Sequence, residues 1–418
     1  MKQRLLLVSF DAVGESDVDR LLSLPHFGAL AEQGCLVQGV RSSFISNTYP
    51  AHTSIVTGCH PKRHGVTENT YPVPGDNNPD WRWYEKVIRR PTLFKKAKAA
   101  GLTCAAVLWP VTAGSRSIRY NVPEIFANRR WKSQVLVSLK GGSPLLQTRG
   151  VLKYGKEMRG ISQPQLDDFA CRMMEDIILR KKPDVMALHL TDADTHKHLY
   201  GVHSEEAMQA IDRMDARLGT VLQALTAAGI REETAVIVLG DHYQKEISFE
   251  WDPNELLLEK GLQQKDRKGR LTAWRAWVKC AGGTAYLHLN DPEDQAALDE
   301  VRALFQRLID EGTGPIARFL SAEEMDLSGF SASCPFGIEA ADGTAFAHGG
   351  MSFPHRGQHG YSLQQPGYNT FYLAEAPGVA PGKVITGGTI LDIAPLCFSI
   401  LQLPEEDTDG RINPELFS

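Results

Sequence analysis

The chain of 418 residues is 42% hydrophobic and 23% charged, which is typical of a globular protein with one large core and insertions, or with two domains. Its 45 basic and 50 acidic residues give a net charge of −5, so neither a nucleic-acid groove nor a polybasic membrane patch is indicated. The seven cysteines are scattered and form no CxxC pair, which indicates reduced thiols and no thiolate zinc site.

The first apolar run, in MKQRLLLVSFDAVG, is too short for the core of a signal peptide, and we interpret it as a strand. No later apolar run is long enough to span a bilayer. We therefore expect a cytoplasmic protein that has no membrane partner.

Apolar runs and helical periodicities alternate along the first 264 residues. Apolar runs predict strands at Arg4–Phe10, Leu36–Val40, Leu102–Leu108, Asp184–Leu190 and Ala235–Leu239. Helices are predicted at Pro25–Gln33, Tyr49–Thr57 (with Asn47 or Thr48 as the cap), Pro91–Ala100, Gln165–Leu179 and Glu205–Ala228. Strands that alternate with helices favour an α/β fold built on a doubly wound, mostly parallel sheet.

Two stretches interrupt this alternation. Residues 112–162 have no clear period, and we expect an insertion there near the substrate side. Residues 265–345 mix strand-like and helical patterns, which predicts a small α+β insertion subdomain. The catalytic core would then comprise residues 1–264 and 346–418, with a closing strand at Asn369–Ala374 and a closing helix within Gly388–Leu401.

The segment SNTYPAHTSIVTGCHPKRHGVTEN, from Ser46 to Asn69, contains a candidate nucleophile. Pro50 stands just inside the predicted helix start, where its missing N–H is not needed. The free N–H groups and the positive dipole end of a helix start can bind a phosphate group. Thr48 lies at this start, although its hydroxyl needs a base or a metal to ionise it. Taken alone, the segment is more simply a capped helix followed by a Gly-rich turn.

Several side chains that could bind a metal follow the predicted strands, where α/β sheets collect their ligands. The candidates are Asp11, Asp194, His198, Asp241, His242 and His359. This set of carboxylates and imidazoles suits zinc, with manganese or iron as possible substitutes. Two such ions about 4 Å apart would form the clamp that phosphoryl transfer uses. Any one of these residues alone is weak evidence, because an isolated Asp is more often a cap or turn residue.

The order of the motifs resembles the nucleotide pyrophosphatase/phosphodiesterase branch of the alkaline phosphatase superfamily. The matching stretches are FDAVG, NTYPAHTSIVTG, PKRHGVTEN, DTHKHLYG, GDHYQ and GQHGY, which span Asp11 to Tyr361. The resemblance implies an alkaline-phosphatase-like three-layer sandwich with a mostly parallel central sheet and a small α+β insertion.

The resemblance also implies a role for each matching residue. One zinc ion would be bound by Asp194, His198 and His359. A second would be bound by Asp11, Asp241, His242 and Thr48. Thr48 would also be the nucleophile and form a phosphothreonine intermediate, while Asn69 and the Thr48 N–H would donate hydrogen bonds to a phosphoryl oxygen.

The chain departs from the family pattern beside two of these motifs. Lys197 precedes the ligand His198 where the family usually has Gly, and GDHY replaces SDHG, so that Tyr243 takes the last position. We expect both changes to alter the wall of the site. Asp192 and His196 have the same i, i+4 spacing as Asp194 and His198, but Gly201 lies at the family distance only from the second pair.

The motifs predict a metal-dependent hydrolase that cleaves phosphodiester or pyrophosphate bonds in a nucleotide or another small molecule. The alternatives are a phosphonate hydrolase of the phosphonoacetate type, a phosphomonoesterase that uses an added cation (Lys62, Arg63 or Lys197), and an inactive binding protein. A sulfatase is disfavoured, because the Thr at the nucleophile position cannot be oxidised to the aldehyde that sulfatases need. The sequence leaves the natural substrate and the oligomeric state open.

Overall fold

An eight-stranded, mostly parallel sheet forms the centre of the protein in the computed structural model, which describes residues 3–312, 314–330, 334–349, 355–404 and 406–417. Strand β1 (Arg4–Phe10) lies between β5 (Val185–Leu190) and β6 (Thr234–Gly240), and all three run parallel. The full order is β18 (Lys383–Thr386), β2 (Cys35–Val40), β17 (Thr370–Glu375), β6, β1, β5, β3 (Cys104–Val107) and β4 (Tyr120–Val122). Strand β17 is antiparallel to both of its neighbours.

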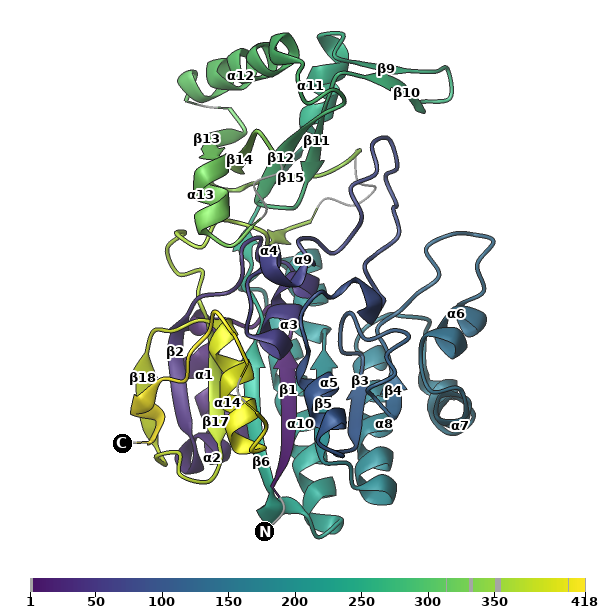
Figure 1. Ribbon diagram of the computed structural model, residues 1–418, viewed down its shortest axis with the longest axis vertical. Coiled ribbons are helices and arrows are strands. Elements are labelled where there is room, and N and C mark those ends of the chain that lie inside the picture. Colours follow the sequence, from purple (N-terminus) through teal and green to yellow (C-terminus); the bar gives the residue numbers. More distant parts are fainter. Residues whose placement is uncertain (1–2, 313, 331–333, 350–354, 405, 418) are drawn as a thin grey trace.

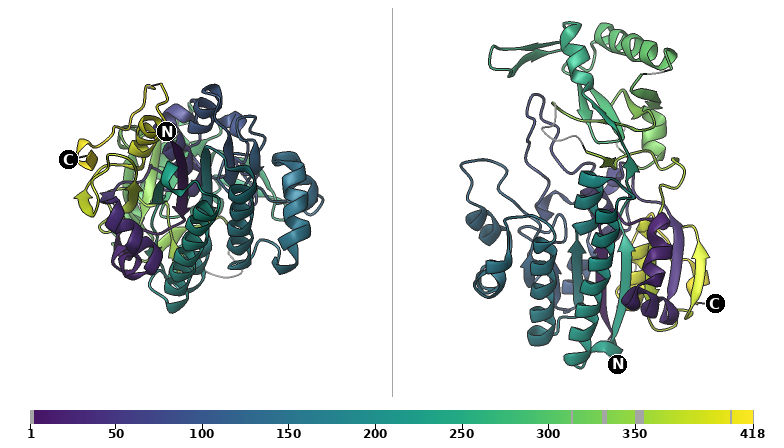
Figure 2. Two further views of the ribbon diagram at one scale, coloured as in Figure 1. Left: turned by 90° about the horizontal axis from the view of Figure 1, so that it is seen from below. Right: turned by 180° about the vertical axis from the view of Figure 1, so that it is seen from behind.

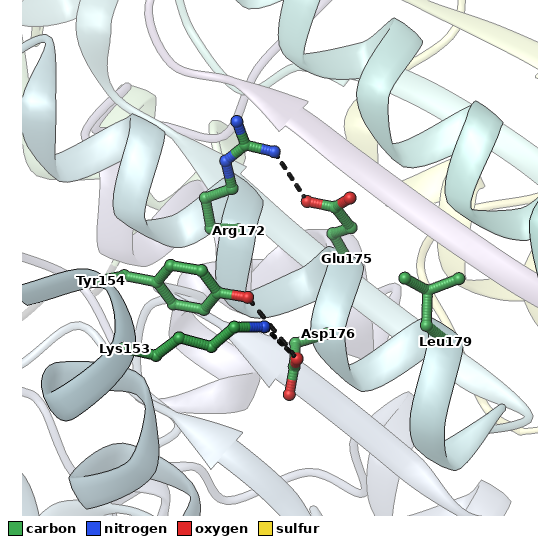
Figure 3. A pocket seen from close by; sticks show the side chains of 6 residues that line it. All are labelled: Lys153, Tyr154, Arg172, Glu175, Asp176 and Leu179. Carbon is green, nitrogen blue, oxygen red and sulfur yellow. Dashed lines mark hydrogen bonds and ion pairs between the residues drawn. The ribbon is translucent and has the colours of Figure 1, made fainter.

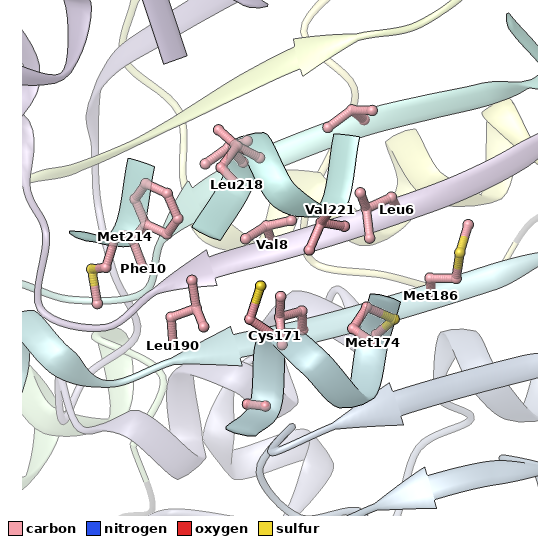
Figure 4. Close-up of a cluster of buried hydrophobic side chains, with 14 of the residues drawn as sticks. Leu6, Val8, Phe10, Cys171, Met174, Met186, Leu190, Met214, Leu218 and Val221 are labelled. Carbon is pink, nitrogen blue, oxygen red and sulfur yellow. The ribbon is translucent and has the colours of Figure 1, made fainter. Parts of the chain in front are cut away.

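Strand β1 is buried on both faces because its side chains alternate between two cores. Leu6, Val8 and Phe10 pack on α8 (Gln165–Lys181) and α10 (Glu205–Ala227), as Figure 4 shows. Leu5 and Leu7 belong to the opposite core, which includes residues of α3 (Thr48–Thr57), α5 (Leu93–Ala99) and α14 (Ile393–Ile400). Helices α1 (Val18–Ser23) and α2 (Pro25–Gln33) join α8 and α10 on the first face (Figure 2).

The predicted fold class is confirmed, since helices cover both faces of a mostly parallel sheet. A second, four-stranded antiparallel sheet has the order β11, β12, β14, β13 and lies beyond the carboxyl ends of the central strands (Figure 1). Its strands are β11 (Ala276–Cys280), β12 (Thr284–Leu289), β13 (Ile316–Ser321) and β14 (Phe336–Ala340). Helices α11 (Pro253–Glu259), α12 (Gln295–Asp310) and α13 (Ala322–Leu327) flank it. We propose that these four strands, α12 and α13 form the small insertion subdomain predicted at residues 265–345, whereas α11 precedes those bounds and packs against β11.

The segment 112–162 contains more regular structure than its sequence predicts. Strand β4 joins the edge of the central sheet beside β3, and α6 (Gln134–Gly141) and α7 (Pro144–Tyr154) follow it. The three-residue strand is too short to give a period, and the helices expose many of their apolar residues. Among the described residues, no helix is both long and apolar enough to cross a membrane.

The central position of β1 predicts a large cost for any cavity at its middle. Leu7 is completely buried, and Leu7→Ala is expected to lower the free energy of unfolding by about 2–5 kcal/mol. Chemical denaturation of the two proteins measures the difference. The control Leu327→Ala changes a side chain that is 77% exposed and is expected to stay within about 0.5 kcal/mol of the parent. Equal losses from both variants would contradict this account of the core.

Candidate metal and phosphoryl-transfer site

Three adjacent parallel strands deliver most of the predicted site residues to one edge of the sheet. Asp11 follows β1, and Asp241 and His242 follow β6. Asp194 and His198 lie on α9 (Asp192–Tyr200), which begins directly after β5. Because parallel strands end at the same edge, the three connections are neighbours in space.

Helix α3 and a late loop complete the site. Thr48 is the first residue of α3, and His359 follows the short strand β16 (Gly357–Gln358). The structure thus brings all seven predicted metal-site residues together, in two adjoining groups.

The first group surrounds the Nε2 atom of His242. This nitrogen lies 3.1 Å from Thr48 Oγ1, 3.3 Å from Asp11 Oδ1 and 3.4 Å from Asp241 Oδ2. Four potential ligand atoms therefore converge on one small region of the buried edge.

The second group consists of Asp194, His198 and His359, whose ligand atoms lie within 4.8 Å of one another. The two groups adjoin, because ligand atoms of Asp11, Asp194 and His242 also lie within 4.8 Å of one another.

Backbone and amide groups fix the orientation of the second group. His198 Nδ1 donates to the Gly357 carbonyl oxygen at 2.8 Å, and His359 Nδ1 donates to Asn47 Oδ1 at 2.7 Å. Both rings therefore keep Nε2 free to bind a metal, as ligand histidines commonly do. Gln244 donates to Asp194 Oδ1 at 2.6 Å.

The electrostatics of this cluster fit divalent cations. Asp11 Oδ1 and Asp241 Oδ2 are buried without a hydrogen bond among the described residues. Burial, and then repulsion from neighbouring carboxylates, raises the pKa of Asp11 well above its ordinary value. Burial is also the main cause that raises the pKa of Asp241 to about 8, and the charge of Asp194 adds to it. Buried carboxylates can be ionised near neutral pH only if a positive charge lies beside them. The combination of these carboxylates with imidazoles suits zinc.

The start of α3 is arranged to present Thr48. Asn47 occupies the N-cap position but makes no side-chain cap bond, because its amide oxygen is bonded to His359. Asn69 Oδ1 instead accepts the Tyr49 N–H at 2.9 Å. That bond orients the Asn69 amide and leaves its NH2 group available for a ligand. As the first helical residue, Thr48 has an N–H without an intrahelical acceptor.

Lys197 and Tyr243 do not line the wall of the site as expected; they contact each other in the interior. The Lys197 ammonium is completely buried and lies 4.5 Å from the centre of the Tyr243 ring. It donates to Asp17 Oδ2 at 2.6 Å and to the Ala12 carbonyl oxygen at 2.8 Å. Ala12 in turn donates its N–H to Asp241 Oδ1 at 3.2 Å. Lys197 therefore holds the turn that follows Asp11.

Asp192 and His196, the alternative pair with the same spacing, form contacts within the protein that stabilise its fold. Asp192 accepts hydrogen bonds from Arg213 at 2.8 and 2.9 Å and from Arg217 at 2.7 Å, and its side chain is completely buried. His196 Nδ1 lies 2.9 Å from Asp192 Oδ1. This pair ties α9 to α10 and leaves Asp194 and His198 to face the site.

Sequence reasoning missed two buried histidines beneath the site. His189 Nε2 lies 3.3 Å from Asp11 Oδ2, and His52 Nδ1 donates to the Thr48 carbonyl oxygen at 2.8 Å. His52 lies four residues after Thr48 on the same helix, a spacing that could have indicated the contact. His189 lies within β5, where no pattern distinguishes it from core residues.

Glu124 was also missed, because it lies in the irregular stretch after β4. Its Oε2 atom is buried and has no hydrogen bond among the described residues. Burial raises the pKa of Glu124 to about 8, and the charges of Asp194 and Asp241 contribute. Its charge also raises the pKa of the Tyr49 hydroxyl, after burial. Glu124 therefore lies near the metal-site carboxylates, beside the residue that follows the candidate nucleophile.

A further group of possible ligands consists of Cys280, at the end of β11, and of Asp252 and His348, which lie just outside the two ends of the predicted insertion. Its polar atoms already serve the fold. Asp252 caps α11 through the Asn254 N–H at 2.9 Å and also accepts the Gly349 N–H at 2.8 Å. His348 Nε2 accepts the Cys280 N–H at 3.1 Å. We therefore assign this group a structural role.

The arginine contacts of Asp192 predict that its removal weakens the fold and leaves the metal site intact. Asp192→Asn removes the buried carboxylate that Arg213 and Arg217 share, although Arg217 keeps Asp167 and Asp168 as partners, and is expected to cost about 1.5–3 kcal/mol. Thermal unfolding measures the loss, and elemental analysis should find unchanged bound metal. The matched control Asp212→Asn removes an exposed partner of Arg20 and should cost less than about 1 kcal/mol.

The pH dependence of this contribution follows from the same contacts. Although burial opposes ionisation, the hydrogen bonds from Arg213, His196 and Arg217 hold the pKa of Asp192 well below its ordinary value. The stabilisation is therefore complete above the unfolded-state pKa of about 4 and is lost as the pH falls below it. Loss of bound metal from Asp192→Asn would contradict the structural assignment.

Comparison with known proteins places this site in a family. Residues 5–362 match the family described as type I phosphodiesterase / nucleotide pyrophosphatase. The bis(5'-adenosyl)-triphosphatase ENPP4 of Bos taurus is 28% identical over 249 residues, which are 57% of this chain and 47% of that protein. Venom phosphodiesterase 2 of Crotalus adamanteus is 26% identical over 58% of this chain and 27% of its own length. These matches span about half or less of the curated relatives.

The fold is shared with solved structures over the whole chain. Murine ectonucleotide pyrophosphatase / phosphodiesterase 5 (ENPP5) superposes with a TM-score of 0.70 at 20% identity and covers 100% of both chains. An inactive variant of the same murine protein, solved in complex with AMP, gives a TM-score of 0.68 at 19% identity and covers 98% of this chain and 97% of its own. The fold is therefore the alkaline-phosphatase-like one that the motifs imply. The chain belongs to the type I phosphodiesterase / nucleotide pyrophosphatase family.

Proposed function

We propose that the protein is a metal-dependent hydrolase of phosphodiester or pyrophosphate bonds in small molecules, with Thr48 as its nucleophile. The observation that carries this proposal is the position of Thr48 Oγ1. It lies 3.1 Å from His242 Nε2, among buried carboxylates, at the start of a helix. A cation bound among these carboxylates would lower the pKa of the Thr48 hydroxyl, and the start of the helix beside it can bind a phosphate group.

Two zinc ions, with manganese or iron as possible substitutes, would neutralise the buried carboxylates. Asp194, His198 and His359 would hold one ion, and Asp11, Asp241, His242 and Thr48 the other. When bound, such ions lower the pKa of a hydroxyl and draw charge from the phosphoryl oxygens. The orphaned oxygens of Asp11 and Asp241 support this assignment.

The side chains of the protein then carry the reaction in two displacements. The Thr48 oxygen attacks phosphorus in line with the leaving group, and the bond from phosphorus to the leaving oxygen breaks as the new ester forms. The free NH2 of Asn69 and the N–H of Thr48 hold a non-bridging oxygen, where negative charge develops. Water then attacks phosphorus, the bond from phosphorus to Thr48 Oγ1 breaks, the phosphate monoester leaves, and a proton from the water restores the Thr48 hydroxyl.

The contacts of the basic residues near the site favour a diester over a monoester as the substrate. A monoester carries an additional negative charge, which an added cation would have to bind. Lys62 donates to Asp326, Arg63 is paired with Asp407 and Asp409, and Lys197 is buried against Asp17. All three cations proposed for a monoesterase therefore already have a partner.

Three aromatic residues beside the proposed nucleophile, Tyr49, Trp81 and Phe126, indicate which ester groups the site could accept. The Tyr49 ring contacts Trp81 edge to face at 5.2 Å between centroids, and Trp81 contacts Phe126 at the same distance. Trp81 and Phe126 are both partly exposed. Such a wall suits a nucleobase or another flat or apolar group on the ester.

Replacement of Thr48 tests the nucleophile. Thr48→Ala should lower kcat for bis-p-nitrophenyl phosphate and p-nitrophenyl thymidine 5′-monophosphate by at least about 1,000-fold, because the attacking oxygen is removed. The control Thr53→Ala alters a threonine of the same helix whose hydroxyl donates to the Tyr49 carbonyl oxygen, and should remain active. Faster turnover of phosphonoacetate or p-nitrophenyl phosphate than of the diesters would instead favour the alternative activities.

Removal of the metal tests the carboxylate cluster independently of activity. The folded-state pKa of Asp241, about 8, lies above its unfolded value of about 4. Chelator-treated protein should therefore lose thermal stability as the pH rises from 4 to 8. Zinc should abolish this dependence, and Asp241→Asn should reduce it in the metal-free protein. A metal-free protein whose melting temperature does not change over this range would exclude the proposed repulsion.

A further inference from the structure

Exposed apolar side chains gather on one peripheral segment of the molecule, outside the site. Among the described residues, ten large apolar side chains expose more than half of their surface, and seven of them lie between positions 131 and 161. They are Trp131, Val135, Leu136, Leu145, Val151, Leu152 and Ile161. Trp131 is 82% exposed and Leu145 is 89% exposed, and such residues gathered on one segment differ from the single exposed apolar residues that are normal on protein surfaces.

The exposure follows from the faces of the two helices that carry most of these residues. Helices α6 and α7 lie side by side at the edge of the molecule, beyond β4 (Figures 1 and 2). On α7, Leu146 packs against the core, whereas Leu145 and Leu152 face solvent. Residues seven apart lie on the same face of a helix, so α7 is apolar on its outer side as well as its inner side.

The same segment carries a strong positive charge. Residues 129–161 contain eight arginines and lysines and a single glutamate, although the whole chain has a net charge of −5. Arg130, Lys140, Lys156 and Arg159 have no ion pair among the described residues, and all four are exposed beside the apolar side chains. The net charge of the whole chain does not show this local excess of basic residues, because acidic residues elsewhere outnumber them.

A basic groove of about 520 Å3 lies next to the apolar face, between α7 and α8. Its lining includes Arg119, Arg149, Arg180 and Lys181, together with the exposed Leu145. Asp176 is its only acidic lining residue, and Lys153 donates to this carboxylate at 3.0 Å (Figure 3). The groove therefore places positive charge next to the exposed apolar side chains of α7.

We propose that α6, α7 and the residues that flank them form a docking face for membranes that contain anionic phospholipids. Exposed Trp and Leu side chains can enter the interface between headgroups and acyl chains, and the surrounding basic residues are attracted to anionic headgroups. This inference is independent of the proposed reaction, and it differs from the expectation from the sequence that the protein has no membrane partner.

Charge complementarity favours a membrane over the other occupants of such a face. A second copy of the chain would bring two identical, strongly basic patches together across a twofold axis, and like charges repel. Nucleic acid would match the positive charge but would leave the apolar side chains without a partner. An anionic bilayer satisfies both features.

Flotation with lipid vesicles tests the proposal on the full chain. Vesicles of phosphatidylcholine alone are compared with vesicles that also contain phosphatidylglycerol, at low and high salt. The triple variant W131S/L145S/L152S removes three exposed apolar groups and should weaken binding to the anionic vesicles at least about tenfold. The control Leu327→Ser changes a comparably exposed leucine of the insertion and should bind as the parent does.

Two further measurements separate the outcomes. Turnover of a water-soluble diester should be unchanged in the triple variant, because none of its three positions lies in the site. Light scattering after gel filtration reports the oligomeric state. Binding that requires anionic lipid, weakens with salt and is lost only in the triple variant supports the proposal. Absence of vesicle binding, equal binding to neutral vesicles, or a dimer that the triple variant dissociates would overturn it.

Discussion

Mutual repulsion among buried carboxylates is the constraint on which this structure depends. Asp11, Asp194 and Asp241 meet at the ends of three adjacent strands, and at an effective dielectric constant of about 20 two unit charges about 4 Å apart repel by about 4 kcal/mol. Such a cluster can be ionised only if cations accompany it. The parallel sheet supplies the rigidity that holds the carboxylates together against this repulsion, because its strands are packed on both faces.

Groups behind the ligands set the positions of the ligands. Lys197 fastens the turn after Asp11, and Asn47 gives up its usual cap bond in order to orient His359. A buried ammonium is costly unless it is paired, and here Asp17 and a carbonyl oxygen compensate for the burial. Lys197 and Tyr243 are the two residues that depart from the family pattern, and they contact each other in the interior. Their effects on the site are therefore expected to be coupled. The two changes thus affect the support beneath the proposed ligands and leave the proposed ligands themselves in place.

The sequence predicts those elements in which periodicity and end signals agree. Strand β1 and helix α2 have the predicted bounds, α3 starts one residue before its predicted first turn, and α10 differs by one residue at its end. The residues proposed for the metal site could be grouped from the sequence because most of them follow a strand. Short edge strands such as β18 carry too few residues to show a period, and the outward apolar residues of α6 and α7 blur the helical pattern. Glu124 and His189 could not be found, because only the folded chain brings them near the carboxylates.

The antiparallel strand β17 has a consequence for the order in which the protein can assemble. It lies between β2 and β6, so residues 370–375 separate two strands that both come much earlier in the chain. On the ribosome, β2 cannot join the rest of the sheet until this late segment has emerged. His359 and β17 leave the ribosome close together, so the histidine that completes the cluster becomes available as the sheet closes. The group of Asp194, His198 and His359 would therefore be complete only in chains that are almost fully synthesised, whereas Asp11, Thr48, Asp241 and His242 all emerge earlier.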